Sequence, residues 1–180
     1  MARPEKGRSD LSARKITDLA LRQIEAEGPQ GISFRSLAKQ LSVTPMALAH
    51  HIGTREDLLK AMVLSVFHQM EEINPNQSPS ERILALMSDY CRRVLAHPRL
   101  VQIVFSDPLR YYPGPLEQLT VQLQSLLTLA GKGQLVRDVI VDYTHGFALS
   151  AAAARSAGLA NAPGLDQYRQ GLAWILQSPA

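Results

Sequence analysis

The chain has 180 residues, of which 46% are hydrophobic and 19% charged, with a formal net charge of +3. This composition is that of an ordinary globular protein and excludes the collagen-like, low-complexity and intrinsically disordered classes. The single cysteine, Cys91, cannot form an internal disulfide, so nothing points to secretion. The longest stretch without a charged residue, 40–54, is too short and too polar to span a bilayer, and the polar start lacks the apolar run of a signal peptide. We therefore expect a cytoplasmic protein that does not associate with membranes.

Charge is distributed unevenly along the chain. Residues 1–60 hold ten Lys or Arg and seven Asp or Glu, whereas residues 61–180 hold nine of each kind. The net positive charge therefore lies in the first third, as it would in a nucleic-acid-binding surface joined to a neutral body. A solvated basic tail explains the charge equally well, so charge alone does not decide between the two.

The first third of the chain is predicted to hold four helices. The first has one apolar face and ends at the Gly-Pro of residues 28–29, because proline cannot continue a helix. Ser33 is the expected N-cap of a short second helix, and the Thr-Pro of residues 44–45 opens a third. A fourth begins at residues 54–57, which resemble a capping box with Asp in place of Glu, and is expected to reach Glu72.

The remaining residues predict five further helices. Residues 74–80 form the clearest linker, and residues 78–81 supply the cap, proline and acid that start the next helix. The apolar run 100–105 fits a strand or a buried helix, and because no second strand candidate exists we expect a short helix. Residues 111–115 are an expected loop. The last three helices are expected over 116–130, 134–157 and 165–176, which gives an all-α fold of about nine helices.

Residues 32–52 carry the pattern of a helix-turn-helix, with a helix, a turn of about three residues and a second short helix. Ala38 is small at the point where two helices must cross closely. A compact apolar core is expected from Ile32, Leu37, Leu41, Val43 and Leu48. The second helix of such a motif lies in the major groove of DNA. Because two short helices cannot bury their inner faces alone, we expect a three-helix DNA-binding domain over residues 1–53 and a helical body over 54–180.

This segment resembles the TetR/AcrR family of transcriptional regulators. The matching stretches are GISFRSLA (31–38), LSVTPMAL (41–48), HI (51–52) and REDLL (55–59), and the end of the first helix also fits. The resemblance covers roughly residues 11–63, a third of the chain, and is far more specific than a lone helix-turn-helix pattern. It implies an all-α homodimer with an N-terminal DNA-binding module and a C-terminal bundle for ligand binding and dimerisation.

The resemblance assigns DNA-contacting roles position by position. Arg35 matches a position that reaches a base or a phosphate. The groove-facing positions of the recognition helix correspond to Thr44, Pro45, Met46, Ala47 and His50. His51 matches a histidine near the phosphate backbone, and Arg55 matches a basic residue that contacts phosphate, while the caps Ser33 and Thr54 complete the set. Arginine can bond guanine O6 and N7 together, and the methyl groups of threonine and alanine can touch the methyl group of thymine.

Two residues depart from the family pattern. Ser42 stands in the turn where the family usually has glycine, and a non-glycine residue at positive φ costs about 1 kcal/mol, so an adjusted turn is expected. Ala49 stands in the recognition helix where the family usually has a tyrosine that donates to a phosphate. This second departure bears on operator affinity and not on the fold.

Other constellations in the sequence favour structural interpretations. His50 and His51 point about 100° apart on a helix and do not converge on a metal, while His68 and Glu72 lack a third ligand. The Gly-Lys-Gly of residues 131–133 lacks the full spacing and the preceding strand of a phosphate loop. The sequence contains no Gly-x-Ser-x-Gly, no paired catalytic carboxylates and no Cys–His dyad signature. We therefore expect no metal, no cofactor and no enzymatic activity.

The body supplies candidate residues for a ligand pocket, although any one of them could simply fill a core. They are Phe67, Met87, Tyr90, Phe105, Tyr143, His145 and Phe147. Because helical bodies can hold mostly apolar pockets with a few polar groups, Tyr90 and His145 are the expected polar members. Asp89 and Arg93 lie four residues apart and are expected to form an exposed ion pair rather than ligand contacts.

The last two helices are the expected dimer surface. Residues 149–154 (LSAAAA) offer small side chains that let helices approach closely, and the final helix has more apolar surface than one intrachain face needs. The expected interface residues are Leu149, Ala152, Leu165, Tyr168, Leu172, Ile175 and Leu176. A palindromic operator requires a two-fold protein. The alternative is a final helix packed within its own chain.

These patterns predict a cytoplasmic, homodimeric regulator, a repressor released from a palindromic operator by a small apolar or amphipathic effector. Repression rather than activation rests on the resemblance alone. One alternative is a DNA-binding regulator without a ligand, whose pocket is filled by side chains. Another is a helical small-molecule-binding or enzymatic protein that has lost DNA binding, which Ala49 makes conceivable. The sequence names neither the effector, nor the operator, nor the regulated genes.

Overall fold

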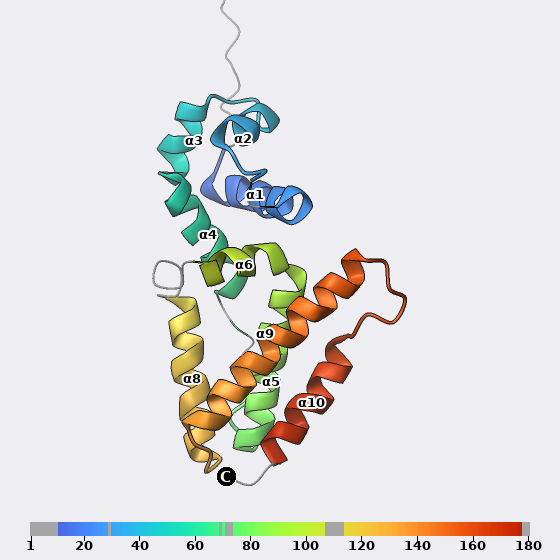
Figure 1. The fold of residues 1–180 in the computed structure, drawn as a ribbon. Helices are drawn as coiled ribbons and strands as arrows, with labels where there is room; N and C mark the ends of the chain where they lie inside the picture. Colours follow the sequence, from blue (N-terminus) through green and yellow to red (C-terminus); the bar gives the residue numbers. More distant parts are fainter. Residues whose placement is uncertain (1–10, 29, 69, 71–73, 107–113, 178–180) are drawn as a thin grey trace, which may run out of the picture. The chain divides into compact units, whose positions relative to one another are not determined.

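The computed structural model describes residues 11–28, 30–68, 70, 74–106 and 114–177. Over these residues the chain has nine α-helices and no strand, so the expected all-α fold is confirmed (Figure 1). The helices are α1 (Ala13–Glu27), α2 (Phe34–Gln40), α3 (Pro45–Ile52), α4 (Arg55–Phe67), α5 (Pro79–Ala96), α6 (Pro98–Ser106), α8 (Pro115–Leu129), α9 (Gln134–Ser156) and α10 (Leu165–Gln177). None of the described helices is long and apolar enough to cross a membrane.

The chain divides into two compact units, residues 1–65 and 66–180. Helix α4 runs across this division, so its last two residues, Val66 and Phe67, belong to the second unit. The expected boundary between residues 53 and 54 lies at the start of the same helix. It stays a prediction of where the DNA-binding module ends.

Side-chain caps start the three helices of the first unit. The hydroxyl groups of Ser12, Ser33 and Thr44 each accept a hydrogen bond from the backbone N–H three residues further on. Each cap pairs one of the N–H groups that a helix start leaves without an intrahelical partner. The helices pack their inner faces together in a core that contains Ile16, Ala20, Ile24, Leu37, Ala38 and Leu48.

Ser42 takes the left-handed conformation in the turn between α2 and α3, with a φ of 56°. The amide of Val43 donates to the carbonyl of Ala38 at 3.0 Å, a bond typical of a helix that ends in a left-handed residue. The turn therefore has the shape that a glycine would adopt without strain, and the serine bears a cost of about 1 kcal/mol.

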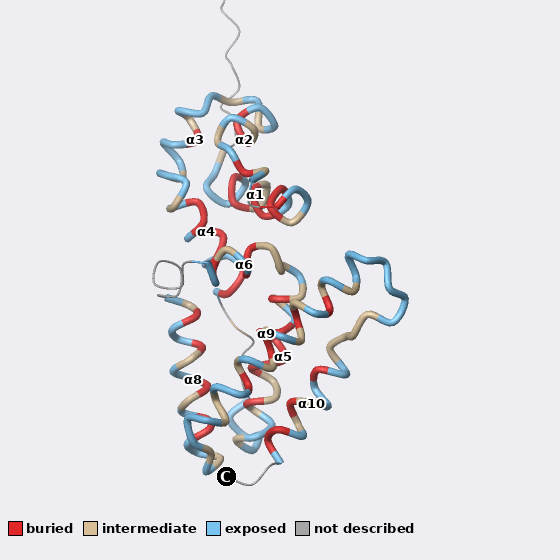
Figure 2. The backbone as a smooth tube through the Cα atoms, viewed as in Figure 1, coloured by how far each residue is buried: buried red, intermediate tan, exposed pale blue. Residues whose placement is uncertain are grey.

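Helix α5 is the central helix of the second unit. It contacts α6, α8, α9 and α10, and its buried residues are red in Figure 2. The expected cap at its start is a complete capping box, in which Ser78 and Glu81 each accept the other's backbone N–H. The hydrogen bonds from Ser78 stabilise the carboxylate and lower the pKa of Glu81.

Helix α4 ends earlier than predicted. Its last residue is Phe67, five residues before the expected end at Glu72, and residues 71–73 lie outside the described residues. The guanidinium group of Arg93 donates to carbonyl groups at this helix end. A side chain thus pairs carbonyls that another helical turn would otherwise have to satisfy.

The ambiguous apolar run 100–105 lies within α6, so the prediction of a short helix is confirmed. Of the expected loop over 111–115, residues 111–113 lie outside the described residues. Pro115 is already the first residue of α8, where its missing N–H is no loss.

Candidate DNA-binding surface and body cavity

Helix α3 exposes most of its predicted DNA-contacting side chains. Leu48 is fully buried and anchors the helix to the core of the first unit, and Ala47 is half-buried. The exposed residues are Thr44, Pro45, Met46, Ala49, His50 and His51. Met46 is 82% exposed, a high value for a large apolar side chain. A helix held by one face with the opposite face open can enter a groove of DNA.

Arg35 is exposed on α2, and the start of this helix is fixed by a residue that the sequence did not single out. Gln23 on α1 is buried and donates from Nε2 to the carbonyl of Gly31 at 2.9 Å and to Oγ of Ser36 at 2.7 Å. Together with the Ser33 cap, these bonds set the backbone position from which Arg35 projects. Glutamine on a helix is usually solvated, so the sequence carried no signal for this role.

The start of α4 carries the expected capping box. The amide and hydroxyl groups of Thr54 donate to the carboxylate of Asp57 at 2.8 and 2.7 Å, and the amide of Asp57 donates back to Thr54 at 3.1 Å. These bonds lower the pKa of Asp57. The hydroxyl of Thr54 therefore takes part in the helix cap, and its contact with DNA stays a prediction. The next residue, Arg55, has an exposed side chain beside the N–H groups of the helix start.

The second unit contains a cavity of about 100 Å³. It is lined by Phe67, Met87, Tyr90, Val101, Val104, Phe105, Leu116, Leu119, Thr120, Leu123, Val141 and His145. Five of the seven predicted pocket residues are among them. The sequence did not single out the aliphatic residues of α6 and α8, because nothing distinguishes a leucine that lines a cavity from one that fills a core. None of the lining residues is Asp, Glu, Lys or Arg.

Tyr90 and His145, the two predicted polar members of the pocket, both line the cavity. The phenol oxygen of Tyr90 and Nε2 of His145 share a hydrogen bond of 2.8 Å. Burial lowers the pKa of His145 to about 4, against a smaller opposing effect of Asp142, so the imidazole is neutral at physiological pH. Phe105 packs edge-on against the same imidazole, with 4.4 Å between ring centroids.

Tyr143 and Phe147, the two other predicted pocket residues, do not line the cavity. Their rings pack around Tyr168 of α10, with centroid distances of 5.3 and 5.4 Å. The phenol of Tyr168 also shares a hydrogen bond of 2.7 Å with the hydroxyl of Thr144. Both residues lie on α9 with His145, but they face α10 and help to fix that helix. Periodicity alone did not separate these faces.

The predicted dimer residues of α10 are largely buried within their own chain. Tyr168 and Leu172 have no exposed surface, because α5 and α9 cover this face of the helix. Ile175 and Leu176 are each 9% exposed. The half-buried members of the set are Leu149, Ala152 and Leu165. Tyr168 and Leu172 are therefore core residues of their own chain, and the large apolar side chain that α10 exposes is Trp174.

Asp89 and Arg93 form the expected ion pair, but the pair is not exposed. The side chain of Asp89 has no exposed surface, and that of Arg93 is 19% exposed. The carboxylate of Asp89 lies 2.9 Å from Nε of Arg93, and it also pairs with Arg92. The i, i+4 spacing predicted the pairing but carried no information about burial.

Metal-ligating and nucleophilic side chains were compared over the described part of the chain. No three His, Cys, Asp or Glu residues among them lie close enough to hold a metal ion. Cys91 is buried on α5, and burial raises the pKa of its thiol to about 12, so the thiol stays protonated. A protonated, buried thiol is a poor nucleophile.

No family model matches the chain. Among curated proteins, an HTH-type transcriptional regulator of Saccharopolyspora erythraea is 28% identical over 100 residues, which are 55% of this chain and 42% of that protein. HTH-type transcriptional regulator BetI of Rhizobium meliloti is 26% identical over 89 residues, 47% of this chain and 44% of that protein. The chain thus spans less than half the length of these curated relatives.

Solved structures match almost the whole chain. BioQ of Mycobacterium smegmatis is 21% identical with a TM-score of 0.71, and the match covers 92% of this chain and 96% of that one. A BioQ structure with its double-stranded DNA operator gives 20% identity, a TM-score of 0.66 and coverage of 91% and 99%. ActR, a TetR family protein of Streptomyces coelicolor in complex with (S)-DNPA, is 23% identical with a TM-score of 0.65. That match covers 92% of this chain and 95% of the ActR chain. The chain therefore has the fold of the TetR-family regulators, which its helix-turn-helix residues had indicated.

Proposed function

We propose that the chain is a sequence-specific, DNA-binding transcriptional regulator of the TetR type. The observation that carries this proposal is the exposed face of α3, which follows a Thr44 cap and contains Met46 at 82% exposure on a helix anchored by buried Leu48. The shared fold includes BioQ, which has been solved with its operator. In this proposal the protein acts in the cytoplasm as a homodimer on a palindromic operator, and it has no enzymatic activity.

The DNA contacts follow from the exposed residues. Arg35 reads a base from α2, while Met46, Ala47 and His50 read the groove from α3. Arg55 binds a phosphate beside the start of α4, where the helix N–H groups add to its positive charge. Thr44 acts mainly as the cap that fixes the recognition helix, because its hydroxyl accepts the amide of Ala47 at 3.1 Å.

The effector site is the cavity of the second unit, and we infer that it takes an uncharged, mostly apolar molecule. Its lining is apolar except for the Tyr90–His145 pair and Thr120. A charged group would lose its hydration there without meeting an opposite charge, at a cost of several kcal/mol. The pair offers a hydrogen-bonding partner at one end, which suits a ligand with one polar group. Repression relieved by such an effector is the mode of action we propose.

The DNA-binding part is tested by selection from random double-stranded DNA, followed by a binding titration at stated salt. We expect a palindromic consensus that the full chain binds at least about 1,000-fold more tightly than a scrambled sequence. Equal affinity for consensus and scramble would reject the regulator and favour an architectural protein. No measurable binding would favour a helical protein that has lost this function.

The effector part is tested with two fluorescent probes of one skeleton, neutral N-phenyl-1-naphthylamine and anionic 8-anilinonaphthalene-1-sulfonate. We expect the neutral probe to bind and to weaken operator binding, and the sulfonate to bind much less well. The variant Thr120→Phe fills the cavity and should remove probe binding. Thr128→Phe is the matched control, because both threonines lie on α8 and donate to the carbonyl four residues back, but Thr128 is exposed.

A ligand-independent regulator is the second candidate, and the size of the cavity favours it. A cavity of about 100 Å³ is small beside the roughly 300–1,000 Å³ of most ligand sites. If the side chains fill the body, neither probe binds and operator affinity does not respond to either. The two candidates share the DNA-binding surface and differ in whether the cavity opens.

A further inference from the structure

We propose that Arg93 is a positioning residue that ties the C-terminal end of α4 to α5, and that an effector larger than one ring fits the cavity only when this tie breaks. The link to an effector rests on the proposed function. The tie itself is a property of the free protein and does not depend on DNA or ligand.

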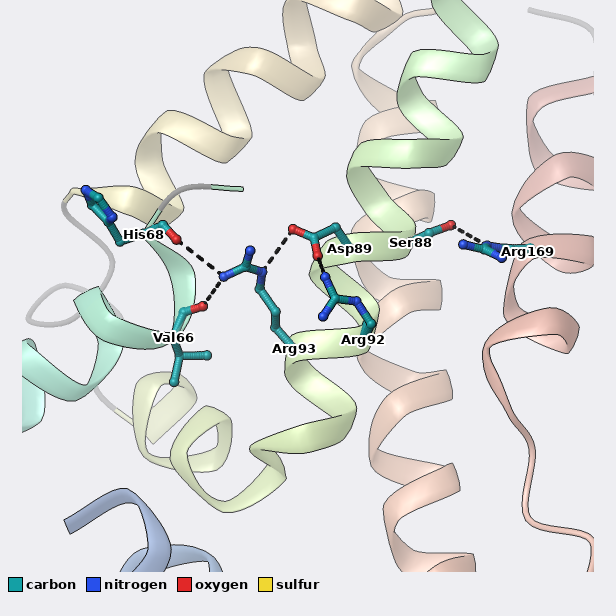
Figure 3. Close-up of polar contacts among 7 residues, drawn as sticks. All are labelled: Val66, His68, Ser88, Asp89, Arg92, Arg93 and Arg169. Atoms are coloured by element: carbon teal, nitrogen blue, oxygen red, sulfur yellow. Dashed lines mark hydrogen bonds and ion pairs between the residues drawn. The ribbon is translucent and has the colours of Figure 1, made fainter. Parts of the chain in front are cut away.

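The tie joins a carboxylate, a guanidinium group and two backbone carbonyls. The buried carboxylate of Asp89 on α5 accepts Nε of Arg93 at 2.9 Å. Nη1 of the same guanidinium donates to the carbonyl of Val66 at 2.5 Å and to the carbonyl of His68 at 3.3 Å. Figure 3 shows the guanidinium group between the carboxylate on one side and the two carbonyls on the other. Arg92 pairs with the same carboxylate.

The chemistry of this arrangement suits a helix end. The last carbonyls of a helix lack intrahelical donors and carry the negative end of the helix dipole, so a cation is favoured there. The planar guanidinium group holds several N–H donors in one rigid fork, so one side chain can bond a carboxylate and two carbonyls together. Asp89 has no exposed surface, and a buried carboxylate must be paired. Asp89 therefore holds Arg93 in place, and Arg93 holds α4.

The tie lies directly beside the cavity. Phe67, which lies between the two bound carbonyls in the chain, lines the cavity and packs against Tyr90 with 5.6 Å between ring centroids. Tyr90, another lining residue, follows Asp89 on α5. On α4 and on α5, the residues that make the tie are therefore next in sequence to residues that line the cavity. Movement of Phe67 away from Tyr90 carries the carbonyls of Val66 and His68 away from Arg93.

Cavity size connects this movement to ligand binding. The present volume of about 100 Å³ is below the roughly 150 Å³ of a dry cavity known to hold benzene, so a larger ligand must move a wall. Phe67 is the last residue of its helix and is a wall that can move without breaking helical hydrogen bonds further along. Phe105, a lining residue that is 41% exposed, is the other side chain whose movement would enlarge the cavity. A ligand that enters by displacing Phe105 alone would leave the tie intact.

The test compares Arg93→Gln with Arg92→Gln in the full-length chain. Both changes remove one arginine from Asp89, but the side chain of Arg92 is 58% exposed and its change leaves the guanidinium between α5 and α4 in place. Hydrogen exchange without DNA or probe should be about tenfold faster for the amides of residues 63–67 in Arg93→Gln, because the helix end opens locally. Arg92→Gln should match the unmodified chain.

Neutral N-phenyl-1-naphthylamine supplies the second readout. It should bind Arg93→Gln about tenfold more tightly than the unmodified chain, since the open state no longer has to be reached by breaking the tie. Arg92→Gln should again show no change. Arg93→Lys keeps the charge but cannot span both partners, and it serves as the second variant should circular dichroism show that Arg93→Gln is unfolded. The exchange rate and the probe affinity of Arg93→Lys should lie between those of Arg93→Gln and Arg92→Gln.

Each other outcome counts against the proposal in a distinct way. Unchanged exchange at residues 63–67 in a folded Arg93 variant would overturn the tie. Faster exchange with unchanged probe affinity would overturn the coupling to the cavity and point to displacement of Phe105. Operator binding is measured on the same samples. Its absence in the unmodified chain would reject the proposed regulator, while the exchange result would still decide the tie.

Discussion

The phenol of Tyr90 and Nε2 of His145 lie 2.8 Å apart and join α5 to α9 at the polar end of an otherwise apolar cavity. The two residues are 55 positions apart in the sequence. Because burial disfavours the imidazolium form, the pair is a neutral hydrogen-bonding group in the cavity and not a cationic one. It can orient an uncharged ligand but cannot neutralise an anion at physiological pH.

This relationship predicts how stability depends on pH. His145 has a pKa near 6.5 in the unfolded chain and about 4 in the folded chain. Between these values the unfolded state binds more protons, so stability is complete above pH 6.5 and falls as the pH drops toward 4. The loss attributable to His145 is at most about 3 kcal/mol. Urea unfolding at pH 7 and pH 4.5 measures it, and His145→Gln should flatten this dependence.

The control for that experiment is His51→Gln, which removes an exposed histidine from the first unit. It should keep the pH dependence of the unmodified chain. An unaltered dependence in His145→Gln would show that folding does not lower the pKa of His145. The imidazole would then become protonated close to neutral pH, and an anionic effector would become the better proposal.

The first unit was predictable from the sequence because its signals are local. Ser33, Thr44 and the Thr54–Asp57 box are caps whose partners lie three residues away, so sequence spacing alone identifies them. The turn at Ser42 was expected to be adjusted, and its left-handed conformation was not predicted because serine carries no signal for it. Gln23 was missed because its partners, at residues 31 and 36, are set by how α1 packs on α2.

The body was less predictable because its contacts are non-local. Periodicity shows that α10 has an apolar face, but it does not say whether its own chain or a partner covers that face. Tyr168 and Leu172 proved to be covered by α5 and α9. Asp89 likewise has the spacing of a surface pair, and its burial in the second unit has no sequence signature.

The proposed DNA-binding surface predicts different effects for two exposed arginines. Arg35→Ala should cost about 1–3 kcal/mol at one base pair of each half-site, because a bidentate contact to guanine would be lost. Arg55→Ala should weaken binding to all sequences alike and reduce the salt slope, because a phosphate contact releases counterions. Titrations of the operator, single-base variants and a scramble at several salt concentrations separate the two effects. If both variants lose affinity equally for the operator, its single-base variants and the scramble, Arg35 positions the protein without reading a base.

The proposed dimer is predicted to depend on the exposed side of α10. Trp174 is 71% exposed, and tryptophan is enriched among residues that dominate binding energy, so Trp174→Glu should weaken the dimer by at least about 2 kcal/mol. Light scattering should show monomers while circular dichroism keeps its helical signal. Val121→Glu changes a similarly exposed residue on α8 and should remain dimeric. A charge at Leu172 is not a valid test, because this buried residue belongs to the core and the chain itself would unfold.

The turn between α2 and α3 is predicted to tolerate glycine better than serine. Ser42→Gly should raise the free energy of unfolding by up to about 1 kcal/mol, because a left-handed residue without a Cβ is not strained. Ser125→Gly, at an exposed position inside α8, should lower it by about 0.5 kcal/mol. Denaturant unfolding of both variants measures the contrast. Equal and destabilising effects would show that position 42 is relaxed in solution.

The recognition helix supports a gain-of-affinity prediction at Ala49. Ala49 is exposed on α3, so the chain itself has room for a larger side chain. In the TetR resemblance a tyrosine at this position donates to a phosphate, and a hydrogen bond to a charged acceptor contributes roughly 1.5–3 kcal/mol. Ordering the ring cancels part of this, but a two-fold dimer gains the contact twice. Ala49→Tyr should therefore tighten operator binding about tenfold or more, as measured by titration.

Two further measurements show whether the Ala49→Tyr gain comes from a phosphate contact. The phenol adds no cation, so the slope of log affinity against log salt should stay nearly the same, unlike the slope of Arg55→Ala. The gain should also extend to scrambled DNA, because phosphates carry no sequence information. Ala49→Phe supplies the ring without the donor and should gain little. If Ala49→Tyr instead weakens binding while the chain stays folded, α3 lies closer to the DNA than the TetR resemblance implies. The groove contacts assigned to Met46, Ala47 and His50 would then have to be reassigned.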